Sequence, residues 1–153
     1  ILHYSPTGSV ERVLAALLET AAERDVPRLP TWLSPTQVRF VPVGDEHVEY
    51  CDALADDLQS AGIRADVDER DETVGKRIAE AETDWVPYYA VVGDREAESD
   101  DERFAVTVRG ESEERELTFE ELESAVLADV GDLPKKRRYL PKHVGKRPNF
   151  TGR

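Results

Sequence analysis

Residues 37–131 alternate between strand-like and helix-like patterns, and this alternation strongly limits the folds open to the chain. In chain order the expected strands are residues 37–43, 63–69, 86–93 and 103–110, and the expected helices are residues 46–61, 74–85 and 118–131. Strands separated by helices favour parallel crossovers, whereas two strands in succession add antiparallel pairing. The order therefore predicts an α/β fold, a three-layer domain with a mixed, mostly parallel β-sheet flanked by helices.

Local signals support these elements. Apolar residues recur at helical spacing from Cys51 to Leu58, and Gly62 follows as a helix-ending residue. The run VPYYAVVG is rich in β-branched and aromatic residues, as in a strand buried within a sheet. Thr118 and Glu121 have the spacing of a capping box, which predicts the start of the last helix.

The segment SPTGSVERVLAALLE, residues 5–19, predicts a helix that begins just after a glycine. Gly8 would let the backbone approach a ligand closely, and free N–H groups in the first turn of a helix favour anions such as phosphate. Arg12 is therefore a candidate nucleotide contact. Its spacing fits equally well an amphipathic helix whose arginine is simply solvated, so the pattern leaves both interpretations open.

Three prolines within residues 25–35 interrupt the helical pattern and indicate a linker. We therefore expect three parts: residues 1–35 as the end of one domain with its linker, residues 36–133 as an α/β domain, and residues 134–153 as a basic tail.

Charge is distributed unevenly along the chain. The net charge is −13, yet residues 134–153 contain eight basic residues and no acid, so residues 1–133 carry −21. Only five of the 20 basic residues are lysine. This composition predicts a halophilic source, because a salt-filled cytoplasm screens self-repulsion, although an acidic solubilising surface is the alternative. The tail, with Tyr139 and Phe150, could bind RNA or lie across its own acidic body.

Other features exclude several classes of protein. No apolar stretch is long enough for a membrane span, and we expect a cytoplasmic protein. Cys51 cannot form an internal disulfide, and the scattered His3, His47 and His143 predict no metal site. The absence of methionine suggests that residue 1 is not a translation start and that the sequence is a piece of a longer protein.

Five ordered segments carry the most specific signal: GSVERVLAALLE, LPTWLSPTQVRFVPVGDEHVEY, GIRADVDERDETVGKRIAEAE, WVPYYAVVGDRE and FAVTVRG. Together they resemble the C-terminal part of the threonyl-tRNA synthetases, which are class II aminoacyl-tRNA synthetases. The resemblance implies a motif 3 remnant, in which Arg12 is a catalytic residue that contacts ATP, followed by an anticodon-binding domain. It also implies a halophilic archaeal source.

The resemblance further implies what this chain lacks. The other two catalytic motifs and the threonine-binding zinc ligands of the family lie upstream, so we expect this piece to be inactive and to bind neither that zinc nor another cofactor. ATP and threonine would bind through the missing catalytic core, through which the complete enzyme would also form a homodimer. The partner implied for this piece is tRNA(Thr).

The resemblance also implies RNA-binding residues. Glu96 matches the glutamate that contacts guanine, and a carboxylate can accept hydrogen bonds from both N1–H and N2–H₂ of that base. Asp71 stands where many bacterial members have a base-contacting asparagine. The arginine of the family aligns with Arg109 or with Thr107. Lys76 and Arg77 are candidate phosphate contacts, although a solvated helix charge is the alternative.

Two rival functions come from other classes. A non-enzymatic paralogue could use the same α/β domain for protein interaction or regulation, which the motif 3 segment argues against. A small-molecule-binding α/β domain is disfavoured, because no glycine-rich phosphate loop follows any expected strand.

Overall fold

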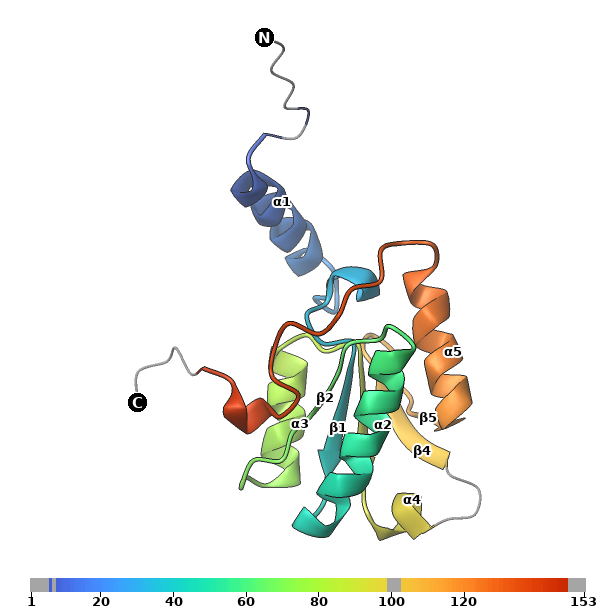
Figure 1. Ribbon diagram of the computed structural model, residues 1–153. Helices are drawn as coiled ribbons and strands as arrows, with labels where there is room; N and C mark the ends of the chain where they lie inside the picture. The colour runs from blue at the N-terminus through green and yellow to red at the C-terminus, as the bar shows by residue number, and fades with distance from the viewer. Residues whose placement is uncertain (1–5, 7, 99–102, 149–153) are drawn as a thin grey trace.

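Five strands form one mixed β-sheet in the computed structural model, which describes residues 6, 8–98 and 103–148 (Figure 1). Their bounds are β1 Val38–Pro42, β2 Ala65–Val67, β3 Tyr88–Val92, β4 Arg103–Val108 and β5 Arg115–Thr118. The strand order is β2-β1-β3-β4-β5; β1 runs parallel to both β2 and β3, while β4 is antiparallel to both β3 and β5. The predicted mixed sheet is confirmed, with its parallel strands gathered in one half.

Helices cover both faces of the sheet, which confirms the predicted three layers. The helices are α1 Val10–Ala22, α2 Val48–Ser60, α3 Val74–Thr83, α4 Asp94–Glu98 and α5 Phe119–Val130, with short 3-10 helices η1 Thr31–Leu33, η2 Asp45–His47 and η3 Val144–Lys146. Residues of α2 and α5 share one core cluster with the sheet. Residues of α3 pack against Tyr89 on the other face.

The buried run of β1 explains why its sequence is apolar on nearly every residue. All five of its residues are buried, since helices lie over both faces. Val38 and Phe40 join the cluster beneath α2 and α5, whereas Arg39 points to the α3 side. Cys51 is fully buried, and burial raises the pKa of its thiol to about 12, so the group remains a small uncharged residue of the core.

The start of α5 shows a predicted local motif. The Thr118 N–H donates to Glu121 Oε2 at 2.9 Å, and the Glu121 N–H donates to Thr118 Oγ1 at 3.2 Å. The capping box is therefore confirmed. Strand β5, immediately before it, was not predicted, because its first residues are exposed and polar and give no apolar alternation.

Helix α1 stands apart from the sheet (Figure 1). Its large apolar residues are exposed, with Val10 at 81%, Leu14 at 53% and Leu18 at 42% of their full accessibility. Its hydrophobic face therefore has no partner within the described residues. None of the described helices is both long and apolar enough to cross a bilayer.

Residues 25–37 are packed against the domain rather than extended away from it. Arg64 donates through Nη2 to the carbonyls of Trp32 and Ser34, at 2.7 and 2.8 Å. Thr31 Oγ1 donates to Asp129 of α5 at 3.3 Å. These bonds hold the proline-rich segment on the end of the sheet where the parallel strands begin.

Gly62 is a position where the backbone requires glycine. Its φ is +87°, a left-handed conformation that costs an L-residue about 1–2 kcal/mol. Gly62→Ala is therefore expected to lower the free energy of unfolding by that amount in urea denaturation. The matched control is Gly75→Ala, which lies within α3 with open space around its Cβ position and is expected to be neutral or stabilising. Equal losses in both variants would contradict the argument.

Candidate nucleic-acid interface

The sheet has a topological switch point between β1 and β3. From β1 the chain crosses through α2 to β2 on one side, and it then returns through α3 to β3 on the other side of β1. In parallel sheets such a switch point separates the loops at the carboxyl ends of two neighbouring strands and favours ligand binding there. Here the loops are those that begin at Val43 and Gly93.

Glu96 lies at this switch point. It is in the five-residue helix α4, which begins directly after Gly93. Its Oε2 accepts a hydrogen bond from the Gly93 N–H at 3.0 Å, which fixes the half-buried carboxylate against the end of β3. Its Oε1 has no hydrogen-bond partner among the described residues. One oxygen is thus positioned by the backbone while the other remains available to a donor.

The face of the sheet beside α3 is partly open. Tyr89 packs against α3, but Val91, Ala105 and Thr107 on the same face are only half-buried. Tyr89 and Thr107 stand directly opposite each other in the β3–β4 pair, so their side chains share this face. Burial raises the pKa of the Tyr89 hydroxyl, which keeps it uncharged. This open sheet face, formed by Val91, Ala105 and Thr107, adjoins the end of β3, after which Glu96 lies.

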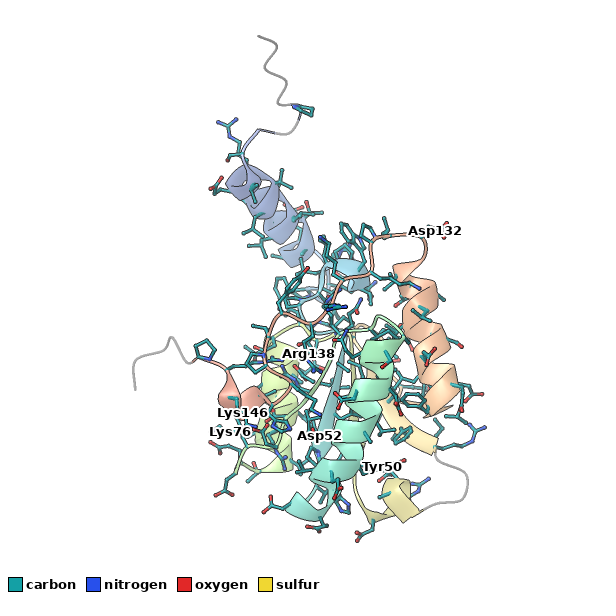
Figure 2. All side chains as sticks on the ribbon, viewed as in Figure 1. Tyr50, Asp52, Lys76, Asp132, Arg138 and Lys146 are labelled. Atoms are coloured by element: carbon teal, nitrogen blue, oxygen red, sulfur yellow. The ribbon has the colours of Figure 1, made fainter. Side chains whose placement is uncertain are left out.

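Asp71, Lys76 and Arg77 lie at the same end of the domain, beyond β2. Asp71 is exposed and lines a small cleft of about 110 Å³ together with Arg77. Arg77 is 6% exposed; its Nη1 donates to the Asp68 carbonyl at 2.8 Å, and its buried Nε has no hydrogen-bond partner among the described residues. Lys76 is exposed and pairs with Glu72, one turn away (Figure 2).

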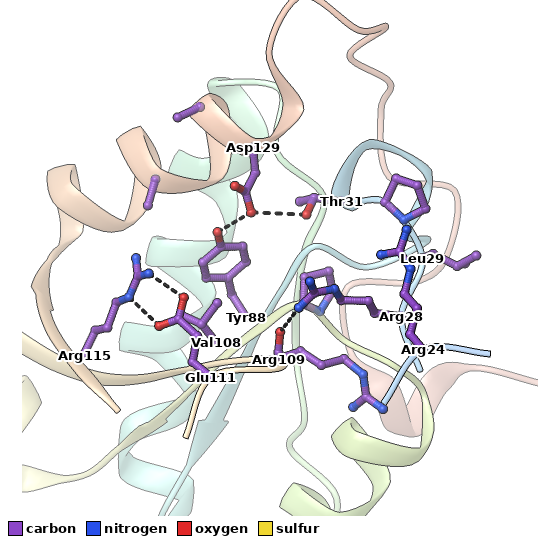
Figure 3. A pocket seen from close by; sticks show the side chains of 14 residues that line it. Arg24, Arg28, Leu29, Thr31, Tyr88, Val108, Arg109, Glu111, Arg115 and Asp129 are labelled. Carbon is purple, nitrogen blue, oxygen red and sulfur yellow. Dashed lines mark hydrogen bonds and ion pairs between the residues drawn. The ribbon is translucent and has the colours of Figure 1, made fainter. Parts of the chain in front are cut away.

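Arg109 lies at the opposite end of the sheet, because β4 runs antiparallel to β3. It is 8% exposed and donates to the Pro27 carbonyl at 2.6 Å, the Glu82 carbonyl at 2.8 Å and the Glu82 carboxylate. In Figure 3 it lines a pocket of about 530 Å³ between the 24–31 segment, β4 and α5, where Arg28 in turn donates to its carbonyl. The guanidinium of Arg109 thus bonds both to Pro27 of the proline-rich linker and to Glu82 of α3.

Arg12 lies in the first turn of α1, remote from the other candidate residues. Its backbone N–H donates to the side chain of Ser9, the N-cap, at 3.4 Å. Its side chain is exposed beside the apolar underside of the helix, where Val13, Ala16 and Leu17 line a surface pocket. The structure thus brings Glu96, Asp71, Lys76 and Arg77 to one end of the domain and leaves Arg12 and Arg109 away from them.

One potential cation-binding group was missed by sequence reasoning. Glu46, His47 and Asp94 bring a ligand atom each within 4.8 Å of one another, just after β1 and β3. Such a trio could hold a cation, although exposed carboxylates commonly lie this close without one. Glu46 and His47 lie in η2, and Asp94 follows 47 positions after His47, in α4. No short spacing motif in the sequence therefore predicts this group.

Comparison with known families decides what this arrangement is. The sequence profile described as "Anticodon binding domain" matches residues 37–129, which include the whole sheet and α2 to α5 except the last residue of α5. The chain belongs to the anticodon-binding domain family. Glu96, Asp71, Lys76 and Arg77 all lie inside the matched part, whereas Arg12 lies before it.

Named relatives and solved structures agree with this family. The chain is 48% identical to a threonine–tRNA ligase of Methanoculleus marisnigri and 48% identical to one of Methanococcus maripaludis, each match covering 98% of the chain and 25% of the relative. It thus spans about a quarter of the length of these relatives. The RNA binding domain of threonyl-tRNA synthetase from Cryptosporidium parvum has a TM-score of 0.68 at 29% identity, covering 79% of this chain and 29% of that one. Prolyl-tRNA synthetase from the same organism has a TM-score of 0.66 at 26% sequence identity, and the match covers 76% of this chain and 25% of that one.

Proposed function

We propose that this chain is the tRNA-binding, non-catalytic part of a threonine–tRNA ligase that recognises the anticodon of tRNA(Thr). The observation that carries the proposal is the identity of 48% across 98% of the chain to enzymes of that name. The position of Glu96 at the switch point of the sheet supports it independently of any relative.

The chemistry proposed for the switch point is recognition of an unpaired base. RNA-binding domains read loops by splaying bases out, stacking them and bonding their Watson–Crick edges. The carboxylate of Glu96, held by Gly93, accepts from N1–H and N2–H₂ of guanine in the middle of the anticodon. The open sheet face gives the base a half-buried surface to lie on, with Thr107 as an additional polar contact.

The remaining candidates contribute around the base. Asp71 accepts from a neighbouring base at the mouth of the 110 Å³ cleft. Arg77 lines the same cleft, where its Nη1 is held by the Asp68 carbonyl, and it adds a positive charge beside the RNA. Lys76 exchanges its surface pair with Glu72 for a phosphate at little cost, since exposed ion pairs contribute about 0–1 kcal/mol.

The proposal extends to the complete enzyme. The exposed apolar face of α1 fits a helix that belongs to the adjoining catalytic core, so residues 1–35 are assigned to that core and its linker, residues 36–133 to the anticodon-binding domain, and residues 134–153 to a tail. Arg12 fits a contact with ATP phosphates, since its exposed side chain has no carboxylate partner among the described residues. ATP, threonine, zinc and the dimer contact all belong to the core, and the enzyme is cytoplasmic.

Replacement of Glu96 tests the proposed base contact. Glu96→Ala is expected to reduce the preference for tRNA(Thr) over a transcript with adenine at the middle anticodon position by about 1–3 kcal/mol, because the guanine donors lose their acceptor. The measurement is the affinity of the full-length protein for both RNAs. Glu113→Ala is the matched control, an exposed acid in a turn with the same change of charge. An equal loss of affinity for both RNAs would remove Glu96 from base recognition.

A further inference from the structure

The basic tail is divided into two parts with different surroundings. In its second part, residues 138–147, the cations other than the exposed Lys146 contact carboxylates of the body of the domain. Arg138 and Lys142 face Asp56, and His143 Nε2 lies 2.8 Å from Asp52. Figure 2 shows this part descending from Arg138 alongside α2 toward Asp52.

This second part also extends the sheet. The Val67 N–H of β2 donates to the Lys142 carbonyl at 3.0 Å, and His143 forms a parallel bridge with Val67. Because β2 is the outermost strand on that side, the tail covers a sheet edge that would otherwise present unpaired backbone groups. Arg147 then reaches the buried carboxylate of Asp66. Residues 138–147 therefore act as an internal strap, one of the two roles considered for the tail.

The first part, residues 135–137, differs in having a fixed backbone but free side chains. The stem of Lys135 packs within 3.5 Å of the Cβ position of Gly62, Arg64 Nη1 lies 3.5 Å from the Lys136 carbonyl, and the N–H of Arg138 donates to Gln59 at 3.1 Å. The side chains of Lys135, Lys136 and Arg137 are exposed and form no ion pair or hydrogen bond with any described residue.

These three cations line a groove of about 600 Å³ against the end of α2, with Gln59, Ser60 and Gly62 as its other wall. Tyr139, beside them, is 72% exposed. Three adjacent cations without acidic partners are notable in a chain that carries 33 acids and 20 bases. A pre-ordered row of cations next to an exposed aromatic ring has the chemistry that binds RNA phosphates and stacks on nucleotides.

We infer that Lys135, Lys136 and Arg137 form a second RNA contact, which binds backbone phosphates of the tRNA away from the anticodon. The inference rests on the proposed function. The groove lies at the amino ends of the parallel strands, on the side of the domain from which α1 departs (Figure 1), whereas Glu96 lies at their carboxyl ends. A tRNA that places its anticodon at Glu96 and its acceptor end at the catalytic core must pass along the domain toward α1, and so past this groove.

The test compares two double variants of the full-length protein that remove equal charge. Lys136→Ala with Arg137→Ala removes two groove cations and leaves Lys135, whose stem packs on Gly62, in place. Arg24→Ala with Arg115→Ala removes two exposed cations that line the 530 Å³ pocket at the end of the sheet opposite Glu96. Deleting the whole tail is less informative, because it would also remove the strap and expose Asp66.

The measurement is tRNA(Thr) affinity from 0.1 to 1 M KCl, on protein shown to be folded by circular dichroism. Each lost phosphate contact reduces the slope of log affinity against log salt by about 0.7–0.9. The groove variant is therefore expected to have a slope shallower by about 1.5, with affinity about 30-fold weaker near 0.1 M and unchanged near 1 M. The control keeps the wild-type slope, and both variants keep the anticodon preference.

Two outcomes would overturn the inference, and they are distinguishable. The first outcome is that the groove variant has the same dependence of log affinity on log salt as the wild type, while the wild type still prefers the cognate anticodon. The groove then does not contact RNA, and the proposed function stands. If the wild type shows no preference for the threonine anticodon, the proposed function fails and the second contact fails with it.

Discussion

Replacing Asp66 with alanine is expected to lower the free energy of unfolding by about 3–5 kcal/mol, because it leaves a buried guanidinium without its counter-charge. Arg39 is 1% exposed, and its Nε and Nη2 donate to the Asp66 carboxylate at 2.9 and 3.1 Å. Thr36 donates to the same carboxylate at 2.7 Å, and Arg147 reaches it from the tail. Burial lowers the pKa of Arg39, but its contacts with Asp66 and Asp84 outweigh this, so the pKa lies above its ordinary value.

The matched control for this prediction is Asp84→Ala, which removes the other carboxylate that Arg39 contacts. Asp84 bonds Arg39 Nη1 at 3.0 Å, but its side chain is 55% exposed, so water can replace it and the expected cost is about 0–1 kcal/mol. Both variants would be unfolded in urea at constant high KCl. Equal costs for the two would mean that the Asp66 pair is as well hydrated as a surface pair and would contradict the argument.

The order of elements in the sheet could be predicted because it depends on local patterns. Each expected strand and helix between residues 37 and 131 is present, since its apolar spacing reflects which face is buried. Strand β1 contains one residue that these patterns do not explain. Arg39 occupies a fully buried position, and its partner Asp66 lies 27 residues further along the chain. No local sequence pattern predicts such a buried ion pair. The same holds for the strap, whose contacts with β2 link residues more than 70 positions apart.

The candidate site was predictable to a smaller extent. Spacing alone could not separate Glu96 from the other loop acids, and the resemblance supplied its role. The structure places it at the switch point defined by the strand order. For Arg109, a strand-end arginine could equally meet RNA or protein. Its surroundings depend on Pro27 and Glu82, which lie 82 and 27 residues away, and the fold brings both to its guanidinium.

In the full-length protein, Arg12→Ala is expected to slow threonine-dependent ATP–pyrophosphate exchange by about 100-fold or more, while anticodon affinity is unchanged. Removal of one preorganised group that stabilises charge in a transition state typically costs a factor of this order. Arg12 lies at the start of α1, before the matched anticodon-binding domain and far from Glu96, so the effect should be confined to the chemistry of activation. Arg24→Ala, which removes an exposed arginine just beyond the same helix, is the matched control and should retain near wild-type exchange.

The same argument predicts that the 153-residue chain alone has no exchange activity. Within the described residues, the pocket beside Arg12 is lined mostly by apolar side chains, and its other cations, Arg24 and Arg28, lie beyond the opposite end of α1. A single exposed guanidinium binds ATP too weakly and too loosely to position it for attack by a carboxylate. Exchange above background by the isolated chain would contradict the assignment of catalysis to a separate core. Wild-type exchange by the full-length Arg12→Ala protein would leave that assignment intact and show instead that Arg12 is a solvated helix charge, the other interpretation that its spacing allows.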